Sequence, residues 1–227
     1  MAREEYAKSS GGGAVDDELA SMLRTCAECR LWAEQDEGPY HRDDQPVRRD
    51  IVEDREGVSL QLGIRLANDD GTPTPGCDVQ VWQCDALGRY SGFPPPGLAA
   101  VNAESAPRTE YILDQTFLRG RQLTDANGMV EFRTIYPGWY PGRTVHIHVM
   151  VDAAGATLTS QLYFPDTITD DVLAMPPYAE RTARDTTNRI DEIFPTGGAP
   201  PVVAIDQVEN GYRAAICLVL PRRAESS

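Results

Sequence analysis

Alternation of apolar and polar side chains at every second position is the dominant pattern of this chain. It runs through residues 58–66 and 144–151, and it recurs more briefly in 77–83, 129–135, 158–164 and 212–220. A period of two is typical of strands that place one face in a core. Because no long helical pattern alternates with these segments, parallel βαβ units are not expected. The pattern predicts a mainly β fold, most economically an antiparallel β-sandwich with long loops.

Helical periodicity is confined to two places. Residues 16–32 carry apolar side chains at helical spacing, beginning at Leu19, and Asp16 or Asp17 can cap the start. Between 167 and 194 we expect short helical turns, because Pro176-Pro177 interrupts any long helix. Residues 92–117 predict a long loop of the kind that often carries function. We expect an N-terminal arm with a short helix over 1–35 and one β-sandwich domain over 36–222.

Charge and hydropathy exclude several classes of protein. The 227 residues carry a net charge of −14, which disfavours binding to phosphate backbones and anionic membranes. No apolar run reaches the roughly 20 residues that a membrane-spanning helix needs. The first residues also lack the apolar stretch of a signal peptide, which predicts a cytoplasmic location, or secretion if a leader has been removed.

The five cysteines, Cys26, Cys29, Cys77, Cys84 and Cys217, are odd in number and scattered. Such spacing does not indicate a disulfide framework. Cys26 and Cys29 form a CxxC motif, but the others supply no second one, so a zinc site built from cysteines alone is not expected. We predict a local disulfide within this motif, or two plain thiols.

Two of the three histidines stand two positions apart in the alternating segment 144–151. Strand geometry places the side chains of His146 and His148 on one face, with backbones about 6.6 Å apart, so both rings can reach one metal ion. The alternative is a polar face that merely contains two histidines. The preceding turn, residues 134–143, is rich in proline, glycine and tyrosine, and no histidine follows His148. Tyrosine is therefore the residue type that remains to complete a metal site, and GxSxG, GxGxxG and P-loop motifs are absent.

Five stretches carry a resemblance to a known family: 37–40, 82–90, 123–128, 132–148 and 160–164. The chain resembles the intradiol ring-cleavage dioxygenases, non-haem ferric enzymes that include protocatechuate 3,4-dioxygenase and catechol 1,2-dioxygenase. The similarity spans about residues 37–220. It implies one Fe(III) per chain, with the ligands Tyr90, Tyr140, His146 and His148. Tyr136 competes with Tyr140, but the family's Pro-Gly-x-Tyr pattern selects Tyr140 and leaves Tyr136 as a packing residue.

The resemblance also implies roles around the iron. Arg143 and Gln161 would lie beside the bound ring and act in catalysis together with Tyr90. Pro39 and Tyr40 are expected either in a wall of the substrate pocket or in a packed turn. Trp139 would pack against that pocket or in the core, Trp82 would be a core aromatic, and His41 a solvated loop residue.

The implied reaction inserts O2 between the two hydroxylated carbons of a catechol-type aromatic and gives a cis,cis-muconate. Ferric iron is a hard ion that prefers anionic oxygen donors, which suits two tyrosinates. No basic residue is assigned to a substrate carboxylate, which favours an uncharged catechol. A homo-oligomer is a further expectation. Two alternatives remain: an iron-dependent tailoring oxygenase on the same scaffold, and a noncatalytic β-sandwich binding module.

Overall fold

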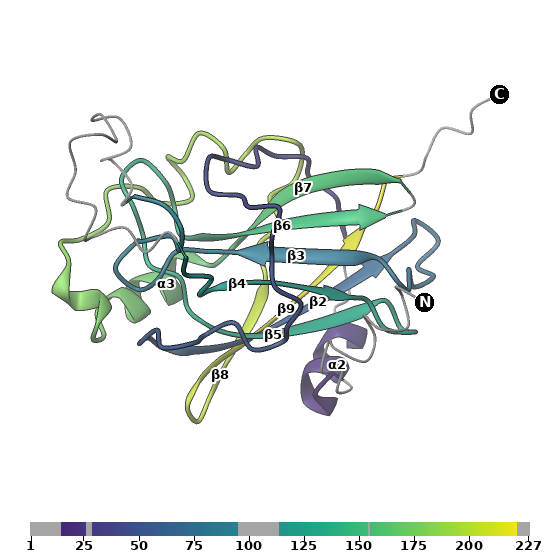
Figure 1. Ribbon diagram of the computed structural model, residues 1–227, viewed down its shortest axis with the longest axis horizontal. Coiled ribbons are helices and arrows are strands. Elements are labelled where there is room, and N and C mark those ends of the chain that lie inside the picture. Colours follow the sequence, from purple (N-terminus) through teal and green to yellow (C-terminus); the bar gives the residue numbers. More distant parts are fainter. Residues whose placement is uncertain (1–14, 26–28, 95–113, 154, 222–227) are drawn as a thin grey trace.

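The computed structural model describes residues 15–25, 29–94, 114–153 and 155–221, and these form two sheets packed face to face (Figure 1). The first half of the chain contributes α2 (Asp17–Thr25), β1 (Arg30–Leu31), β2 (Ser59–Ala67), β3 (Asp78–Trp82), β4 (Arg119–Leu123) and β5 (Met129–Ile135). The second half contributes β6 (His146–Ala153), β7 (Ala156–Tyr163), α3 (Asp166–Leu173), the 3₁₀ turn η2 (Tyr178–Glu180), β8 (Ala204–Val208) and β9 (Gly211–Val219).

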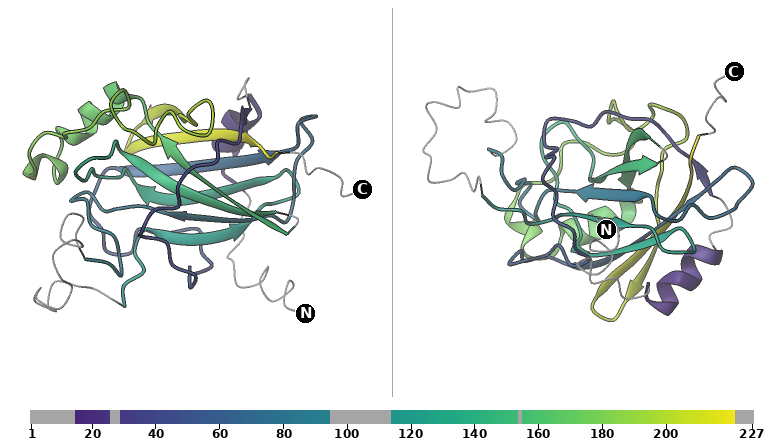
Figure 2. Two further views of the ribbon diagram at one scale, coloured as in Figure 1. Left: turned by 90° about the horizontal axis from the view of Figure 1, so that it is seen from above. Right: turned by 45° about the vertical axis from the view of Figure 1, so that its right-hand side comes forward.

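The first sheet has the strand order β1-β9-β2-β5, with β8 also paired to β9, and the second has the order β4-β3-β6-β7. Figure 2 shows the two layers from other sides. Between them lies one apolar core built from the inward faces of both sheets, including Leu62, Ile64, Val79, Val81, Phe132, Ile147 and Val149. The prediction of a mainly β sandwich is confirmed.

Strand pairing is not wholly antiparallel. β9 runs parallel to β2 on one side and to β1 on the other. Parallel neighbours need a long connection, and the chain makes one here by forming the second sheet and α3 between β2 and β9. Local alternation reports which residues form strands but not the direction of their partners.

Three strands were not predicted, namely β1, β4 and β8. β4 reads Arg-Gly-Arg-Gln-Leu, which has no apolar alternation, and yet Arg119 is 1% exposed. β8 is mostly exposed and owes its place to its pairing with β9. The helix expected over 16–32 ends at Thr25, and Arg30–Leu31 form a strand instead, with the Leu31 side chain exposed.

A disulfide joins Cys29 to Cys217 across 188 residues of sequence. The expectation of a bond or thiol pair within Cys26–Cys29 is therefore wrong for Cys29, while Cys26 lies outside the described residues. The parallel register that pairs Arg30 with Leu218 brings the two cysteines together, and no local motif reports that register. Cys77 and Cys84 are free and buried.

The segment that follows the disulfide, residues 29–40, crosses from one sheet to the other. Trp32 N donates to Val219 O of the first sheet, and Gln35 N donates to Thr159 O of the second. The segment then reaches the end of the sandwich where β6 begins, where a Cβ at Gly38 would lie 3.3 Å from His148 Cε1. These contacts fix the segment against both sheets.

Two helices flank the sandwich. α2 covers the outer face of the first sheet, where Leu19 and Leu23 pack against Met129 and Ala215. Gly63 makes this approach possible, because a Cβ there would lie 2.8 Å from Leu19. The short turns expected over 167–194 are present as α3 and η2. None of the described helices is long and apolar enough to cross a membrane.

Candidate metal centre

The two histidines lie at the start of β6, where the alternation of the strand sends them away from the main core. Ile147, between them, packs in that core. His148 stands opposite Trp82 of β3 and Gln161 of β7. Tyr140 lies in the turn that leads into β6 and forms a bridge with Arg143, and Tyr90 lies in the turn that follows β3.

These four side chains converge at one point. His146 Nε2 lies 3.1 Å from His148 Nε2 and 3.3 Å from the Tyr140 hydroxyl. The ring of Tyr90 lies 5.8 Å from that of Tyr140 and 6.2 Å from that of His148, centroid to centroid. The structure therefore brings together all four residues that the resemblance assigns to the iron.

Hydrogen bonding sets the state of His146. Its Nδ1 lies 2.7 Å from Thr144 O, and a carbonyl oxygen only accepts, so Nδ1 carries the proton and Nε2 offers a lone pair to the centre. On the other side, the buried Tyr90 hydroxyl and His148 Nδ1 have no hydrogen-bond partner among the described residues. A buried phenol without a partner is costly unless a bound group satisfies it.

Burial dominates the electrostatics of the centre. It lowers the pKa of His146 to about 3 and that of His148 well below its usual value, with the nearby Arg143 acting in the same direction. Burial likewise raises the pKa of Tyr90 and Tyr140, and for Tyr140 Arg143 partly offsets it. The imidazoles are therefore neutral, as metal ligands must be, whereas the phenols would need a bound cation to lose their protons.

The donor set itself limits what could bind here. Within the described residues, no three His, Cys, Asp or Glu side chains are grouped to hold a metal ion. A metal at this point would thus be held by two imidazoles and two phenol oxygens. Phenolate oxygen is a hard, anionic donor, so this set fits ferric iron better than a soft or low-charge metal.

Two neighbours hold the ring of His148. The indole of Trp82 stacks on it, and Trp82 is fully buried, so the expected core aromatic also touches the metal centre. The second neighbour is Gly38, in the segment of residues 29–40. A Cβ at Gly38 would lie 3.3 Å from His148 Cε1, and Gly38 has a positive φ of 71°. Glycine suits both requirements at this point.

An aromatic wall adjoins the four side chains. The Tyr40 ring stacks on that of Tyr90 at 4.2 Å and meets the Tyr140 ring edge-on at 6.0 Å. Pro39 beside it is exposed. Trp139 lies in the main core, with the Arg181 guanidinium 4.2 Å from its ring centroid. Tyr136 is buried away from the centre and bonds Thr169 through its hydroxyl at 2.8 Å.

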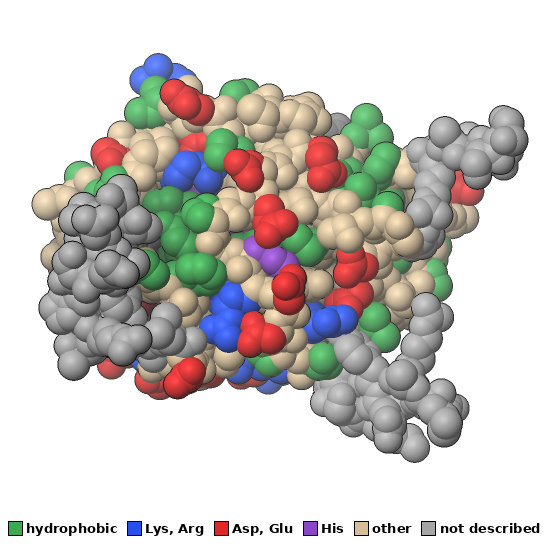
Figure 3. All heavy atoms as spheres, turned by 45° about the horizontal axis from the view of Figure 1, so that its top comes forward, with side chains coloured by type: hydrophobic (Ala, Val, Ile, Leu, Met, Phe, Trp, Pro, Cys, Tyr) green, Lys and Arg blue, Asp and Glu red, His purple; other side chains and the backbone are tan. Residues whose placement is uncertain are grey.

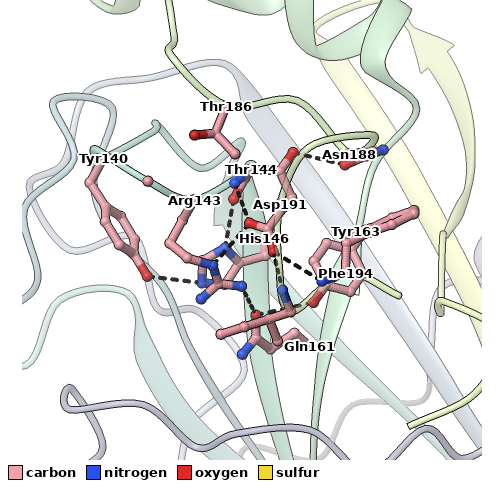
Figure 4. Close-up of polar contacts among 12 residues, drawn as sticks. Tyr140, Arg143, Thr144, His146, Gln161, Tyr163, Thr186, Asn188, Asp191 and Phe194 are labelled. Carbon is pink, nitrogen blue, oxygen red and sulfur yellow. Dashed lines mark hydrogen bonds and ion pairs between the residues drawn. The ribbon is translucent and has the colours of Figure 1, made fainter. Parts of the chain in front are cut away.

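Arg143 and Gln161 meet beside His146 (Figure 4), where Arg143 Nη2 donates to Gln161 Oε1. Gln161 Oε1 also accepts from the Tyr163 hydroxyl, while its Nε2 donates to Asp36 O. Sequence reasoning did not find Tyr163 or Asp191, which binds Arg143. Their bonds join strands and loops far apart in the chain, so no local motif signals them.

Arg119 is a second residue that sequence reasoning missed. Its guanidinium is buried and donates to the carbonyls of Tyr40 and Ser91 and to the Ser91 hydroxyl. Burial lowers the pKa of Arg119 to about 10, so it stays charged at neutral pH. It thereby ties the segment of Tyr40 to the turn of Tyr90. A charged side chain in a short polar strand was its only sequence signal.

The surface near these segments is acidic. Figure 3 shows one histidine with Asp and Glu side chains above and below it and Lys or Arg side chains close by. His41 is partly exposed, with Nδ1 3.1 Å from Glu37 and 4.0 Å from Asp43, and its ring packs edge-on against Trp82. His41, which we expected to be a solvated loop residue, therefore packs against Trp82 and keeps one side open to solvent.

Comparisons with known proteins agree with this arrangement. A family model described as dioxygenase matches residues 34–187. The protocatechuate 3,4-dioxygenase beta chain of Burkholderia cepacia is 30% identical over 194 residues, which cover 80% of this chain and 71% of the relative. The match to catechol 1,2-dioxygenase of Acinetobacter baylyi is 29% identical over 151 residues and covers 44% of that protein, so this chain spans under half its length.

Solved structures place the fold in the same group. The intradiol ring-cleavage dioxygenase from Tetranychus urticae has 33% sequence identity and a TM-score of 0.73, and the match covers 84% of this chain and 94% of that one. The dioxygenase domain of a carbohydrate-binding fusion protein from Streptomyces sp. SirexAA-E follows at 27% identity and a TM-score of 0.61. The chain belongs to the intradiol ring-cleavage dioxygenase family.

Proposed function

We propose that this protein is an Fe(III)-dependent intradiol dioxygenase that converts a catechol-type diol and O2 into a cis,cis-muconate. The observation that carries this proposal is the convergence of two tyrosines and two histidines at one buried point, with His146 Nε2 within 3.3 Å of both His148 Nε2 and the Tyr140 hydroxyl. Membership of the family supports the type of reaction, and the residues support its placement in this chain.

Tyr90, Tyr140, His146 and His148 would hold the iron. Two phenolates, two neutral imidazoles and one hydroxide would balance a charge of +3, and anionic oxygen donors favour the ferric state. When bound, the iron would supply the Lewis-acid chemistry that makes the ring of a catechol-type diol reactive towards O2.

The chain's own residues would prepare the diol. Tyr90, as the phenolate that would hold the iron, would accept a proton from the incoming diol, since its Oη has no hydrogen-bond partner among the described residues. The guanidinium of Arg143 would offset the negative charge that develops on the attacked ring carbon. The stacked rings of Tyr40 and Tyr90 would form one wall against the substrate ring and keep water out.

We further propose that the substrate is an uncharged catechol. The described arginines nearest the centre are already bound: Arg143 to Asp191 and Gln161, and Arg119 to the carbonyls of Tyr40 and Ser91. Arg181 donates to Trp139 O. Arg143 keeps only its Nη1 free, and we assign that nitrogen to the diol ring itself, so a ring carboxylate would find no further spare cation among these residues. The Asp and Glu side chains on the face shown in Figure 3 would also disfavour it. We expect a higher kcat/KM for catechol than for protocatechuate.

Incubation of iron-loaded protein with catechol under air tests the proposed reaction. We expect muconate formation with matching O2 uptake, together with the red-brown colour of tyrosinate-to-ferric charge transfer. Tyr140→Phe or His148→Ala should lose iron, colour and ring cleavage. Tyr136→Phe is the matched control, because it removes a buried hydroxyl that bonds Thr169 instead.

The outcomes separate the competing functions. If the protein is colourless and takes up no iron, the noncatalytic binding module would be the remaining candidate function. A coloured, iron-loaded protein that forms no muconate from any diol in a panel would favour the tailoring oxygenase. Full ring cleavage by Tyr140→Phe and His148→Ala would contradict the ligand assignment.

A further inference from the structure

Asp191 is a buried carboxylate whose hydrogen-bonding capacity is fully used within the protein. Its Oδ1 accepts from Ile193 N at 2.8 Å and Phe194 N at 2.9 Å. Its Oδ2 accepts from Arg143 Nε at 2.9 Å and Thr144 N at 2.7 Å. A carboxylate offers about four acceptor positions. With all four occupied and a side chain 0% exposed, Asp191 is built to hold other groups in place.

The orientation of this carboxylate is fixed from its own loop. Bonds from an aspartate to the backbone N–H groups two and three residues later form a local turn that orients the side chain. Gln35 adds a second anchor, because its Nε2 donates to the carbonyls of Ile193 and Thr196 at 3.0 and 3.1 Å. Asp191 Oδ2 is therefore set independently of Arg143 and faces the start of β6.

Arg143 is held at two of its three nitrogens by this arrangement (Figure 4). Asp191 binds its Nε, and Gln161 Oε1 binds its Nη2. No hydrogen bond joins Nη1 to any described residue. Because the guanidinium is planar, two fixed nitrogens determine where the third nitrogen points. Nη1 is therefore the nitrogen left for a bound molecule.

We propose that Asp191 is the positioning residue that fixes the guanidinium of Arg143 against the ring of the bound diol. This inference rests on the proposed function, since it gives Asp191 its task in that reaction. The residue follows the stretch matched by the family model, which ends at residue 187. Besides Arg143, Asp191 binds the backbone N–H of Thr144, and it makes no hydrogen bond to any of the four candidate iron ligands.

A double-mutant cycle tests this assignment. Asp191→Asn keeps the shape but replaces one acceptor oxygen with a donor, so it should lower kcat for catechol about 10- to 100-fold, the size expected for losing a charged hydrogen bond. Iron content and visible colour should stay unchanged. Arg143→Met should cause at least the same loss, and the double variant should be no worse than Arg143→Met. Asp170→Asn, which breaks the exposed contact to Arg184, is the matched control and should keep wild-type rates.

Proton exchange of the Arg143 side chain gives a readout that needs no iron. In the iron-free wild type, the Arg143 Nε–H signal in a ¹H–¹⁵N NMR spectrum should exchange slowly, because Asp191 binds it in a buried site. Asp191→Asn should make that exchange fast, and Asp170→Asn should not. If Asp191→Asn does not fold, Asp191→Glu keeps the charge but displaces the oxygens, and it should show the same fast exchange.

Additive losses of kcat in the cycle, or slow Nε–H exchange in the Asp191 variants, would overturn the proposal. An iron-loaded wild type that cleaves no diol would refute the proposed function instead. In that case the Nε–H measurement still decides whether Asp191 holds Arg143.

Discussion

The indole of Trp82 lies flat against the imidazole of His148, with ring centroids 4.8 Å apart and planes inclined by 5°. Trp82 ends β3 and His148 stands directly opposite it in β6, so strand register creates this stack. The indole limits rotation of a ring that has no hydrogen bond at Nδ1 among the described residues. Packing takes the place that a hydrogen-bonded partner often has in orienting a metal-binding histidine.

Trp82→Leu should therefore affect iron binding as well as stability. We expect a loss of about 3 kcal/mol in the free energy of unfolding from the cavity, and an iron affinity lowered about 10- to 100-fold because His148 is free to turn. Urea unfolding and iron content after dialysis measure the two effects. Trp32→Leu is the control, since Trp32 belongs to the main core and not to the cluster that joins Trp82 with Tyr40 and Tyr90, and it should cost stability alone. Equal iron retention in both variants would contradict this role of Trp82.

Gly38→Ala should combine backbone strain with a collision. Its φ of 71° disfavours a side chain, and the added Cβ would lie 3.3 Å from His148 Cε1. We expect about 1–2 kcal/mol of lost stability and weaker iron binding. Gly71→Ala has a φ of 82° with nothing within 4 Å, so it isolates the strain and should keep normal iron affinity. Thermal melts and iron titration of both variants make the comparison.

The iron-free protein should lose stability as the pH falls below about 6.5. Burial holds the pKa of His146 at about 3 in the folded state, against about 6.5 in the unfolded chain. Between these values the unfolded chain binds more protons, so stability is full above the higher pKa and declines towards the lower one. The loss from His146 is about 2 kcal/mol at pH 5. Urea unfolding of the iron-free protein across pH 7 to 5 measures the slope, and His146→Gln should make it shallower, with the remainder due to His148.

The Cys29–Cys217 disulfide should make a large contribution to stability, because it closes a loop of 188 residues. Cys29→Ser is expected to cost about 2–5 kcal/mol. Mass spectrometry without reductant should show the bond, and thermal melts should show the loss. Cys77→Ser is the control, because Cys77 is a free buried cysteine. Its loss of stability measures the cost of placing a hydroxyl in a buried position, without the loss of a disulfide.

Such a bond is typical of proteins in oxidising compartments, whereas the cytoplasmic location remains a prediction from the sequence. Fractionation of the source cells tests that location directly. Recovery of the native protein with Cys29 and Cys217 reduced would favour the cytosol.

The sequence was most informative where chemistry and local pattern coincide. Alternation in 144–151 predicted both the strand and the shared face of His146 and His148, because side-chain direction follows directly from the strand period. β4 escaped prediction because Arg119 is buried by hydrogen bonds to carbonyls rather than by apolar character. The parallel pairing of β9 and the partner of Cys29 depend on register between distant segments, which no window of sequence contains.

The same distinction holds within the centre. Tyr140, His146 and His148 lie within nine residues, so a compact motif brings them together, and Tyr90 joins them through a recognisable turn. Asp191 and Gln35 act through backbone groups of a loop that the fold places beside β6. Their side chains are ordinary in sequence and acquire a role only from their position in the fold.

The crossing of residues 29–40 from β9 to β7 has a consequence for biosynthesis. Its first anchors, Cys217 and Val219, lie in the last strand, which also separates β1 from β2. A nascent chain on the ribosome thus lacks the anchor for the segment that carries Gly38 and Tyr40 until β9 has emerged. Assembly of the centre therefore has to follow the synthesis of β9, and a chain stalled before β9 would be unable to complete it.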